Sequence, residues 1–395
     1  MNDRAVRPVA RGNSNDHVRR HNLSTILGLV HHARGMSRSQ LTQTMGLNRS
    51  TIAALVSELA DRDLVREVDA ESTFQVGRPS PIVRPSSTPV GLALNPEIDA
   101  ITLGVVGLGG VVLSKTRHAL SAPPTAERAV AITAGMIDDL RPALDGVHRI
   151  TGIGVAVPGL VRETDGLVRL APHLNWHDEP FARMLESATG IPVLAANDAR
   201  LGGRAESAFG GGRGLRDMVY FNGSPSGIGG GIITGGLPLG GAEGYAGELG
   251  HTMVNPYGTA CHCGAVGCLE TEVRRDRLLE VAGLAGVEDV DLATALTTST
   301  DAMVAAEVGR QLGFLGVALR NTINLLNPRL VVLGGFLADL LAADPLRLGD
   351  LGSNRPLAAS RQSVDIRPAE LGADLLMIGG AELAFESLIA DPAAF

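Results

Sequence analysis

The sequence predicts an α/β protein with a winged helix-turn-helix head in front of a larger body. Three observations lead to this fold class. The chain has 395 residues, more than one compact core usually needs. Its charge is unevenly divided along its length, and apolar runs bounded by glycine alternate with helical stretches after Pro89. Hydrophobic residues make up 45% of the chain, which excludes intrinsic disorder for most of it.

The net charge of −8 is the sum of a basic head and an acidic body. Residues 1–85 hold 12 Arg and 8 acidic residues, a net charge of +4, whereas residues 86–395 carry −12. This asymmetry is expected of a nucleic-acid-binding module joined to a separate domain.

Residues 1–16 are expected to form a disordered basic arm. They lack the apolar stretch of a secretory signal, and no apolar run reaches the roughly 20 residues of a membrane span. We therefore expect a cytoplasmic protein with no membrane partner.

The winged helix-turn-helix is expected over residues 17–84. Apolar residues at helical spacing predict a first helix over 21–32. Ser37 can cap a second helix that ends at Gly46, and Asn48 can cap a third helix over 49–62. An extended segment that starts at residue 64 and returns through residues 74–76 predicts the wing. Four prolines within residues 79–89 predict a linker into the body.

In this geometry the first turn of the third helix meets base edges in the major groove, and a wing arginine can enter a minor groove. The expected DNA contacts are Ser37, Asn48, Arg49, Ser50, Thr51 and Arg78. The alternative is a small helical interaction module whose arginines are solvated.

The body alternates strands with helices, the order of an α/β protein whose ligand groups lie at strand ends. Strand-like runs are expected at 92–94, 101–106, 111–113, 150–157, 192–195, 218–221 and 330–333. Helices are expected over 126–144 and 181–189 and from Asp198 onward.

Two glycine groups follow strand-like runs, at residues 227–231 and at Gly334-Gly335. Successive glycines let backbone N–H groups approach a phosphate or a sugar without interference from a Cβ atom. A tight turn between two strands explains the first group equally well.

All three cysteines lie within eight positions, as Cys261-x-Cys263-x4-Cys268. An odd number of thiols argues against a disulfide framework. Three thiolates and one imidazole would make a closed, structural zinc site. Either His251 or His262 can supply the imidazole, and the spacing does not choose between them. Three buried free thiols are the alternative.

Residues that suit sugar hydroxyls lie near the cysteines and after one strand. Glu248 and Glu270 flank the cysteine segment, and Asn197 and Asp198 follow the strand at 192–195. One Asp can also act as a general base toward a hydroxyl. Solvated surface acids are the alternative reading of each one.

Together these features resemble the ROK family of repressors, open reading frames and sugar kinases, in its regulator branch with an N-terminal winged helix. The resemblance runs from about residue 22 to about residue 388. It rests on motifs in this order: Gly77-Arg78-Pro79, Val157-Pro158-Gly159, Asn197-Asp198, Ser226-Gly227-Ile228-Gly229-Gly230-Gly231, Gly247-Glu248-Leu249-Gly250-His251, Cys261-x-Cys263-Gly264-x2-Gly267-Cys268-Leu269-Glu270, Asn327-Pro328 and Leu333-Gly334-Gly335.

The resemblance implies an actin-like body of two lobes, of the type found in sugar kinases and Hsp70 ATPases. The first lobe would cover 85–196, completed by a C-terminal helix at about 375–392, and the second would cover 197–374. Zinc would be held by His251, Cys261, Cys263 and Cys268. Sugar contacts would fall to Gly159, Asn197, Asp198, Glu248, His251 and Glu270, and Asp198 matches the catalytic base of ROK kinases.

One departure bears on function. ROK kinases open the body with an Asp-x-Gly-Gly-Thr loop for the ATP phosphates, but residues 91–96 here read Gly-Leu-Ala-Leu-Asn-Pro. Phosphoryl transfer depends on positioning and charge neutralisation at the phosphates, so we expect no enzyme and no catalytic residue, with Asp198 a vestigial base. His173 stands where the family usually has asparagine, which leaves the sugar's identity open.

The expected function is that of a sugar-responsive repressor of carbohydrate uptake or catabolism genes. Its partners would be a double-stranded DNA operator and a small sugar or sugar phosphate, and it would act as a homodimer or a tetramer. The alternative is an ATP-dependent sugar kinase with an accessory DNA-binding head.

Overall fold

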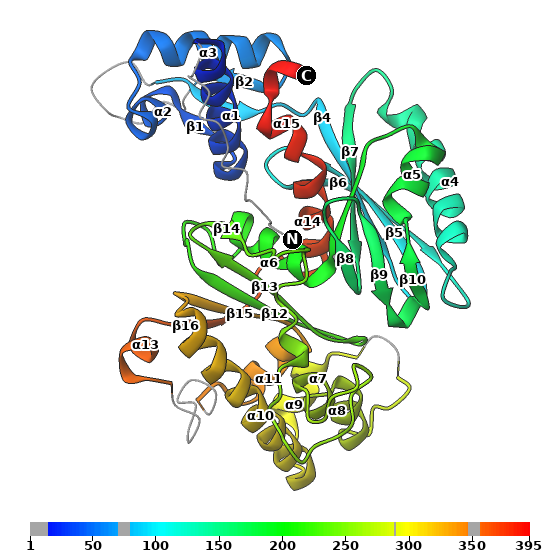
Figure 1. Ribbon diagram of the computed structural model, residues 1–395. Helices are drawn as coiled ribbons and strands as arrows, with labels where there is room; N and C mark the ends of the chain where they lie inside the picture. The colour runs from blue at the N-terminus through cyan, green and yellow to red at the C-terminus, as the bar shows by residue number, and fades with distance from the viewer. Residues whose placement is uncertain (1–14, 70–79, 288–289, 347–355) are drawn as a thin grey trace, which may run out of the picture. The chain divides into compact units, whose positions relative to one another are not determined.

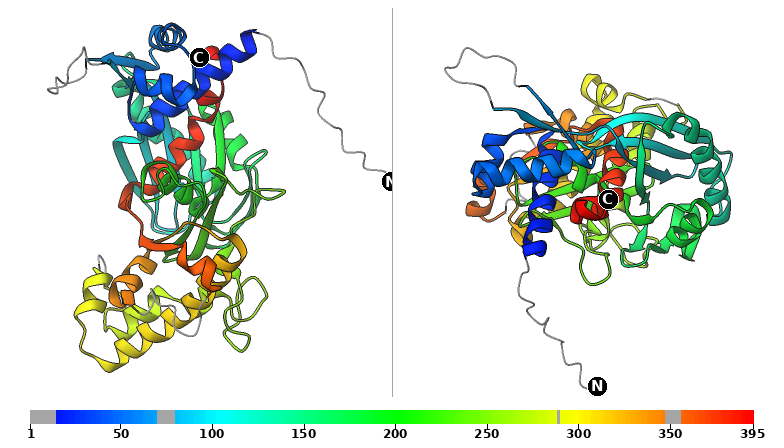
Figure 2. Two further views of the ribbon diagram at one scale, coloured as in Figure 1. Left: turned by 90° about the vertical axis from the view of Figure 1, so that its left-hand side faces the viewer. Right: turned by 90° about the horizontal axis from the view of Figure 1, so that it is seen from above.

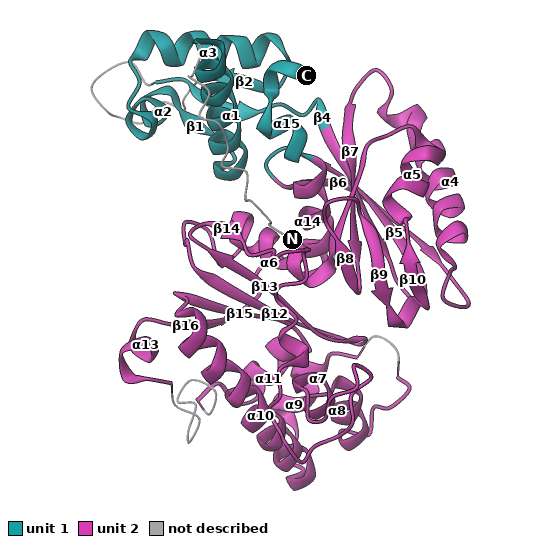
Figure 3. Cartoon of the chain, viewed as in Figure 1, with its two compact units in different colours: residues 1–89, 107–109, 385–395 teal, residues 90–106, 110–384 magenta. Residues whose placement is uncertain are grey.

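The computed structural model describes residues 15–69, 80–287, 290–346 and 356–395. It divides the chain into two compact units (Figure 3). Unit 1 takes in residues 1–89, 107–109 and 385–395, and unit 2 takes in residues 90–106 and 110–384. The head unit is thus larger than the expected span of 17–84, because two distant stretches of chain belong to it.

The head contains the helices α1 (Asn15–Ala33), α2 (Arg38–Met45) and α3 (Arg49–Asp61). Helix α2 lies between the predicted caps and α3 begins after its predicted cap, whereas α1 is longer than the expected span of 21–32 and α3 ends one residue before the expected residue 62. Ser37 forms a capping box with Gln40 at the start of α2, and Gly46 ends that helix in the left-handed region at φ 65°. Asn48 caps α3 by accepting a hydrogen bond from the Thr51 N–H at 2.8 Å. Helix α1 starts at Asn15, so the last two residues of the expected arm are helical.

The wing differs from the sequence prediction. Its sheet has the order β1-β3-β2, built from β1 (Met36–Ser37), β2 (Val65–Val68) and β3 (Ile82–Pro85). The expected return through residues 74–76 lies outside the described residues. The expected linker at 79–89 is wrong, because β3 lies within it and pairs with both neighbours, with Val83 fully buried. Prolines flank this strand at its ends, where a missing N–H is tolerated.

The remaining stretches of unit 1 pack on α1. Helix α15 (Glu386–Ala390) and the 3-10 turn η4 (Pro392–Ala394) both contact it. Arg20 forms an ion pair with Asp391 at 2.9 Å. The buried His31 accepts a hydrogen bond from the Gly109 N–H at 2.9 Å, and its ring packs edge-on against the ring of Phe385. The C-terminal helix expected at 375–392 is therefore two helices, and only the first belongs to unit 2.

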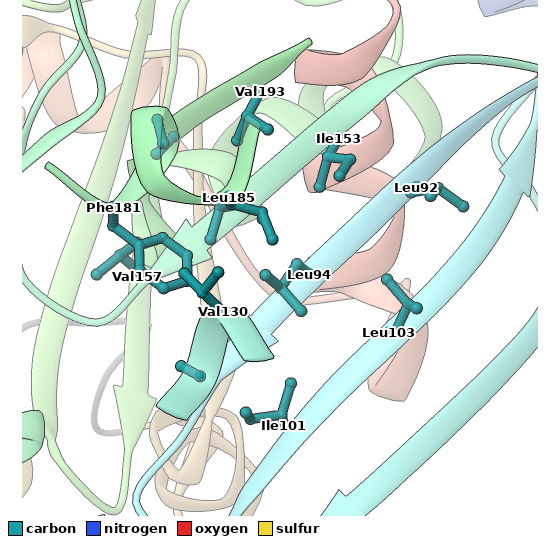
Figure 4. Close-up of a cluster of buried hydrophobic side chains, with 14 of the residues drawn as sticks. Leu92, Leu94, Ile101, Leu103, Val130, Ile153, Val157, Phe181, Leu185 and Val193 are labelled. Carbon is teal, nitrogen blue, oxygen red and sulfur yellow. The ribbon is translucent and has the colours of Figure 1, made fainter. Parts of the chain in front are cut away.

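The first lobe of unit 2 contains a five-stranded sheet with the order β11-β7-β4-β5-β6. Helices α4 (Ala126–Leu144) and α5 (Phe181–Thr189) cover one face and close an apolar core (Figure 4). A small antiparallel sheet, β10-β9-β8, adjoins this core through Trp176 and Val168. The strands are β4 (Pro89–Pro96), β5 (Ala100–Gly107), β6 (Val111–Ala119), β7 (Arg149–Val157), β8 (Leu160–Arg162), β9 (Leu167–Ala171), β10 (Trp176–Glu179) and β11 (Val193–Asn197), with a 3-10 turn η1 (Pro172–Leu174).

The second lobe contains another five-stranded sheet, β14-β13-β12-β15-β16. Its helices cover one face in a layer visible in yellow and orange in Figures 1 and 2. The strands are β12 (Met218–Ser224), β13 (Gly227–Thr234), β14 (Leu237–Pro238), β15 (Leu330–Gly335) and β16 (Asp365–Pro368). The helical elements are η2 (Leu249–His251), α7 (Leu269–Glu272), α8 (Arg275–Val281), α9 (Leu292–Thr298), α10 (Ala302–Leu326), α11 (Phe336–Ala343), α13 (Ala358–Gln362) and η3 (Gly372–Asp374).

Helix α10 is long and apolar enough to cross a membrane by length and composition alone. More than half of its apolar window is buried, and Leu312, Leu315 and Leu319 form part of the second lobe's core. This is the pattern of a core helix, whose buried face packs on the protein's own sheet.

Two helices lie between the sheets of the two lobes, namely α6 (Asp198–Phe209) and α14 (Leu375–Ala384). Leu201 and Leu383 pack against the first sheet at Ala156 and Ala196. Leu375 and Ile378 pack against the second sheet at Tyr220 and Val332 and their neighbours. Both sheets therefore have helices on both faces, which explains why β4 and β5 are buried along their whole length.

The close approach of α14 to β7 generates a testable prediction. A Cβ atom at Gly154 would overlap the carbonyl oxygen of Gly380, so Gly154→Ala should lower the free energy of unfolding by about 1–3 kcal/mol. Gly135→Ala, on α4, is the matched control, because nothing lies within 4 Å of a Cβ atom at that position. This substitution should raise the free energy of unfolding by about 0.5–1 kcal/mol, since alanine favours a helix more than glycine does. Denaturant unfolding measures both, and equal effects of the two substitutions would contradict the packing described.

Candidate ligand and metal site

The ends of two parallel strands bring the first polar residues together. Strand β11 pairs in parallel with β7, so Asn197 and Val157 are partners and Gly159 lies just beyond. The Asn197 side chain accepts a hydrogen bond from the Arg200 N–H at 3.0 Å, which caps α6, and its amide donates to the Gly159 carbonyl at 3.0 Å. Asn197 thereby ties the start of α6, and with it Asp198, to the loop after β7.

The second lobe supplies the other expected sugar contacts. Glu248 directly precedes η2, His251 ends it, and Glu270 lies on α7. All six residues expected to contact sugar line one cavity of about 90 Å³, which we call the small cavity. They are Gly159, Asn197, Asp198, Glu248, His251 and Glu270.

The glycines at 227–231 do not form a phosphate loop. They lie in β13, which pairs with β12 as a hairpin around Pro225 and Ser226. Their small size lets η2 pack against this strand, because a Cβ atom at Gly230 would lie 2.8 Å from the Gly247 carbonyl oxygen. The glycines therefore leave room for the segment that carries Glu248 and His251. Of the two interpretations from the sequence, the hairpin between two strands agrees better with the structure than the phosphate loop.

The small cavity favours the protonated form of its buried carboxyl group. Burial raises the pKa of Asp198 to about 7, and the nearby carboxylates of Glu248 and Glu97 act in the same direction. The Ala199 N–H donates to Asp198 Oδ1 at 2.7 Å, which opposes this shift. Burial also raises the pKa of Glu248, while His251 lowers it. Near neutral pH such a group can donate or accept a hydrogen bond, as a sugar hydroxyl requires.

The cysteine segment folds into a tight loop that brings its thiols to His251. Isolated bridges join Met253 to Cys268 and Ala260 to Val266, and the Cys261 N–H donates to the Ala265 carbonyl at 2.8 Å. One ligand atom from each of His251, Cys261, Cys263 and Cys268 lies within 4.8 Å of every other.

These four residues fit a zinc ion. Cys261 Sγ lies 3.6 Å from His251 Nδ1, and Cys263 Sγ lies 3.7 Å from Cys268 Sγ. With Zn–S bonds of about 2.3 Å and a Zn–N bond of about 2.0 Å, a tetrahedral site has edges of about 3.8 Å between sulfurs and about 3.5 Å between sulfur and nitrogen. His262 is placed differently, with its Nδ1 3.2 Å from Glu270 Oε1 on the wall of the small cavity.

Glu270 links the cysteine cluster to the small cavity. Its Oε1 lies 3.1 Å from Cys261 Sγ and 3.5 Å from His251 Nδ1. His251 takes part in both the cysteine cluster and the small cavity, because its Nδ1 lies 3.6 Å from Cys261 Sγ and the residue also lines the cavity. The metal candidates and the sugar candidates therefore form one connected arrangement.

A second, larger cavity of about 960 Å³ adjoins the first, and we call it the large cavity. Its lining includes Asn95 and the residues that follow the stretch 91–96. Residues 91–96 are buried in β4, and the chain after that strand presents the acids Glu97 and Asp99. Burial and the charge of Asp99 raise the pKa of Glu97. Sequence reasoning missed these two acids and Asn222, although all three directly follow or adjoin a predicted strand, which was the available signal.

The head presents part of the expected DNA-contacting set at the start of α3. Asn48, Arg49 and Ser50 are exposed and Thr51 is half-buried. Asn48 Oδ1 accepts from the Thr51 N–H and from the Ser50 hydroxyl, both at 2.8 Å, and Ser37 Oγ accepts from the Gln40 N–H at 3.2 Å. Ser37 and Asn48 thus have capping roles, and Arg78 lies outside the described residues.

Comparison with known proteins agrees with this architecture. The family model of the ROK family matches residues 98–387. The xylose repressor of Caldicellulosiruptor bescii is 25% identical over 378 residues, covering 90% of this chain and 93% of the relative. The glucokinase of Streptomyces coelicolor is 31% identical over 325 residues, covering 75% of this chain and 98% of that kinase.

Among solved structures, a ROK family transcriptional regulator described as a homolog of the Escherichia coli MLC protein superposes with a TM-score of 0.78 at 26% identity. The match covers 95% of this chain and 98% of that regulator. Because the family model spans well over half of the residues and the full-length match extends through the head, the chain belongs to the ROK family.

Proposed function

We propose that this chain is a sugar-responsive transcriptional repressor of carbohydrate uptake or catabolism genes. The observation that carries this proposal is the joining of a capped helix-turn-helix head to a ROK body in one chain. A relative named xylose repressor matches 90% of the chain, whereas a glucokinase matched along 98% of its own length leaves a quarter of this chain without a counterpart.

The head would read DNA through the first turn of α3. Arg49 and Ser50 are exposed there, and the caps at Ser37 and Asn48 fix where the two helices of the motif begin. The net charge of +4 over residues 1–85 suits a phosphate backbone. A homodimer would place two recognition helices in successive major grooves of a near-palindromic operator, with Arg78 as a further minor-groove contact.

The body would bind a sugar in the small cavity without phosphorylating it. Asp198, Glu248, Glu270 and the Asn197 amide are suited to hydroxyl groups. The kinase alternative is disfavoured because residues 91–96 lack the Asp-x-Gly-Gly-Thr sequence of ROK kinases, and because the acids Glu97 and Asp99 that follow would repel a nucleotide's phosphates. Sugar binding needs to favour the low-affinity form of the head by only about 1–3 kcal/mol to control the operator.

The cysteine cluster would hold a structural zinc ion through His251, Cys261, Cys263 and Cys268. When bound, the ion would cross-link the loop of residues 251–268 and neutralise its thiolates. His251 and Glu270 would then be held at the wall of the small cavity by the same loop.

The DNA contact is tested by substituting one exposed arginine in the head and one in the body. Arg49→Ala should weaken binding to the gene's own upstream region about 5- to 150-fold, the loss of one base contact of about 1–3 kcal/mol. Arg213→Ala, an exposed arginine in unit 2, is the control and should leave affinity unchanged. Fluorescence anisotropy at fixed salt measures both, and an unaffected Arg49→Ala protein would remove α3 from the interface.

The ligand site is tested by Asp198→Asn, which keeps the shape of the side chain and removes the carboxylate. Operator binding should survive, while release by sugar should be lost, because the hydroxyl loses its acidic partner. A gel-shift series with D-xylose, D-glucose and other sugars measures release. In a coupled ADP assay the wild-type chain should show no sugar-dependent turnover, and turnover that disappears in Asp198→Asn would establish the kinase alternative instead.

Zinc is tested by metal analysis of two histidine variants. His251→Ala should lose the bound zinc and lower the melting temperature, because one ligand of a closed site is removed. His262→Ala should retain the zinc, since its ring faces Glu270. Retention of a full zinc complement by His251→Ala, or its loss in His262→Ala, would contradict the ligand set.

A further inference from the structure

The small and large cavities adjoin. Six residues line both of them: Pro158, His173, Asp198, Asn222, Ser224 and Ser226. The shared wall includes Asp198, so a group attached to a sugar hydroxyl that faces this carboxyl would point into the large cavity. With about 960 Å³ against about 90 Å³, the large cavity is in the size range that buries a drug-sized ligand.

The charges of the large cavity do not suit a phosphate. Its two described cations already have carboxylate partners, because Arg117 pairs with Asp99 at 2.6 Å and Lys115 pairs with Asp374 at 2.9 Å. The carboxyl groups of Glu97 and Asp198 also line this cavity. A phosphate ester placed here would meet carboxylates and would have to compete for cations that are already paired.

The polar groups of the large cavity suit hydroxyls instead. Asn95 and Thr102 lie on the strands β4 and β5 with only 5% and 8% of their surfaces exposed, and both line the cavity. The Tyr220 hydroxyl donates to Asn222 Oδ1 at 3.1 Å, which orients this amide with its NH2 group still able to donate. Rigid strands hold these groups, so they are pre-organised for a ligand.

The lining also contains aliphatic side chains, namely Ile98, Ala338, Ala369, Leu375, Leu376 and Met377. A sugar ring has hydroxyls at its edge and C–H groups on its faces, and it therefore matches a cavity whose lining combines polar and aliphatic groups. An alkyl group would match the aliphatic side chains but would make no hydrogen bond to Asn95, which already bonds Glu97, or to Thr102.

We propose that the large cavity is a second subsite for an uncharged sugar ring, so that the effector is an unphosphorylated disaccharide or longer oligosaccharide. The first ring lies in the small cavity, and the second ring enters the large cavity past Asp198 and Asn222. This inference rests on the proposed function, because it takes the small cavity as a sugar site.

Calorimetric titration of the full-length protein tests the second subsite. The probes are D-glucose and D-xylose, the disaccharides cellobiose, maltose and xylobiose, octyl β-glucoside and glucose 6-phosphate. At least one disaccharide should bind tenfold or more tightly than its own monosaccharide, and it should release the operator at correspondingly lower concentration. Glucose 6-phosphate should bind more weakly than glucose.

A cavity-filling variant separates the two subsites. Ala338 lies on α11 and lines the large cavity. Ala338→Trp should abolish the tighter binding of the disaccharide relative to its monosaccharide, while the monosaccharide affinity stays unchanged. Ala342→Trp lies exposed on the same helix and outside the cavity lining, and it should change neither affinity. Should Ala338→Trp fail to fold, Thr102→Val removes one hydroxyl at similar size and should weaken the disaccharide severalfold, again without affecting the monosaccharide.

The outcomes distinguish this inference from the function on which it rests. If a monosaccharide binds as tightly as its disaccharides and releases the operator, the second subsite is wrong and the repressor remains. Tighter binding of octyl β-glucoside or glucose 6-phosphate than of any disaccharide also overturns the second subsite, in favour of an apolar group or an anion. If no sugar in the panel binds or releases DNA, both the second subsite and the sugar-responsive function are overturned.

Discussion

The body depends on the close packing of α6 and α14 between its two sheets. The contact needs glycine, because a side chain at Gly154 would overlap the backbone of α14, and because a Cβ atom at Gly203 would lie 3.1 Å from Gly231 on β13. Interiors this dense transmit displacement rather than absorb it. Since Asp198 is the first residue of α6, the packing that holds the lobes together also fixes the depth and direction of the carboxyl group at the ligand site.

One stretch of chain bears on whether this scaffold only binds a sugar or also phosphorylates it. Residues 91–96 are buried along their whole length in β4, and the carboxyl groups of Glu97 and Asp99, which follow this strand, line the large cavity. The residues expected to contact sugar nevertheless lie together around the small cavity. In the function that we propose, these groups recognise a sugar without phosphoryl transfer, which is sufficient for a regulator.

Sequence reasoning succeeded where the determinants are local. The caps at Ser37, Gly46 and Asn48 placed both ends of α2 and the start of α3, and the expected bounds of α4 and α5 match the observed ones. It failed at β3, because the prolines on either side suggested a linker while the pairing with β1 and β2 is long-range. It also missed the large cavity, whose lining comes from segments almost 300 residues apart. The cysteine spacing alone did not choose between His251 and His262; in the fold His251 lies with the three thiols, and His262 Nδ1 lies 3.2 Å from Glu270 Oε1.

Unit 1 is assembled from distant stretches of the chain, which affects how it folds during synthesis. Residues 15–33 contribute the helix α1, but the partners of that helix include Gly109, Phe385 and Asp391. During synthesis the head is begun first, yet its packing stays incomplete until residues 385–395 have left the ribosome and reached α1. A nascent chain therefore exposes an unfinished DNA-binding unit while the body folds, and any tag or truncation at the C-terminus acts on the head rather than on the end of the body.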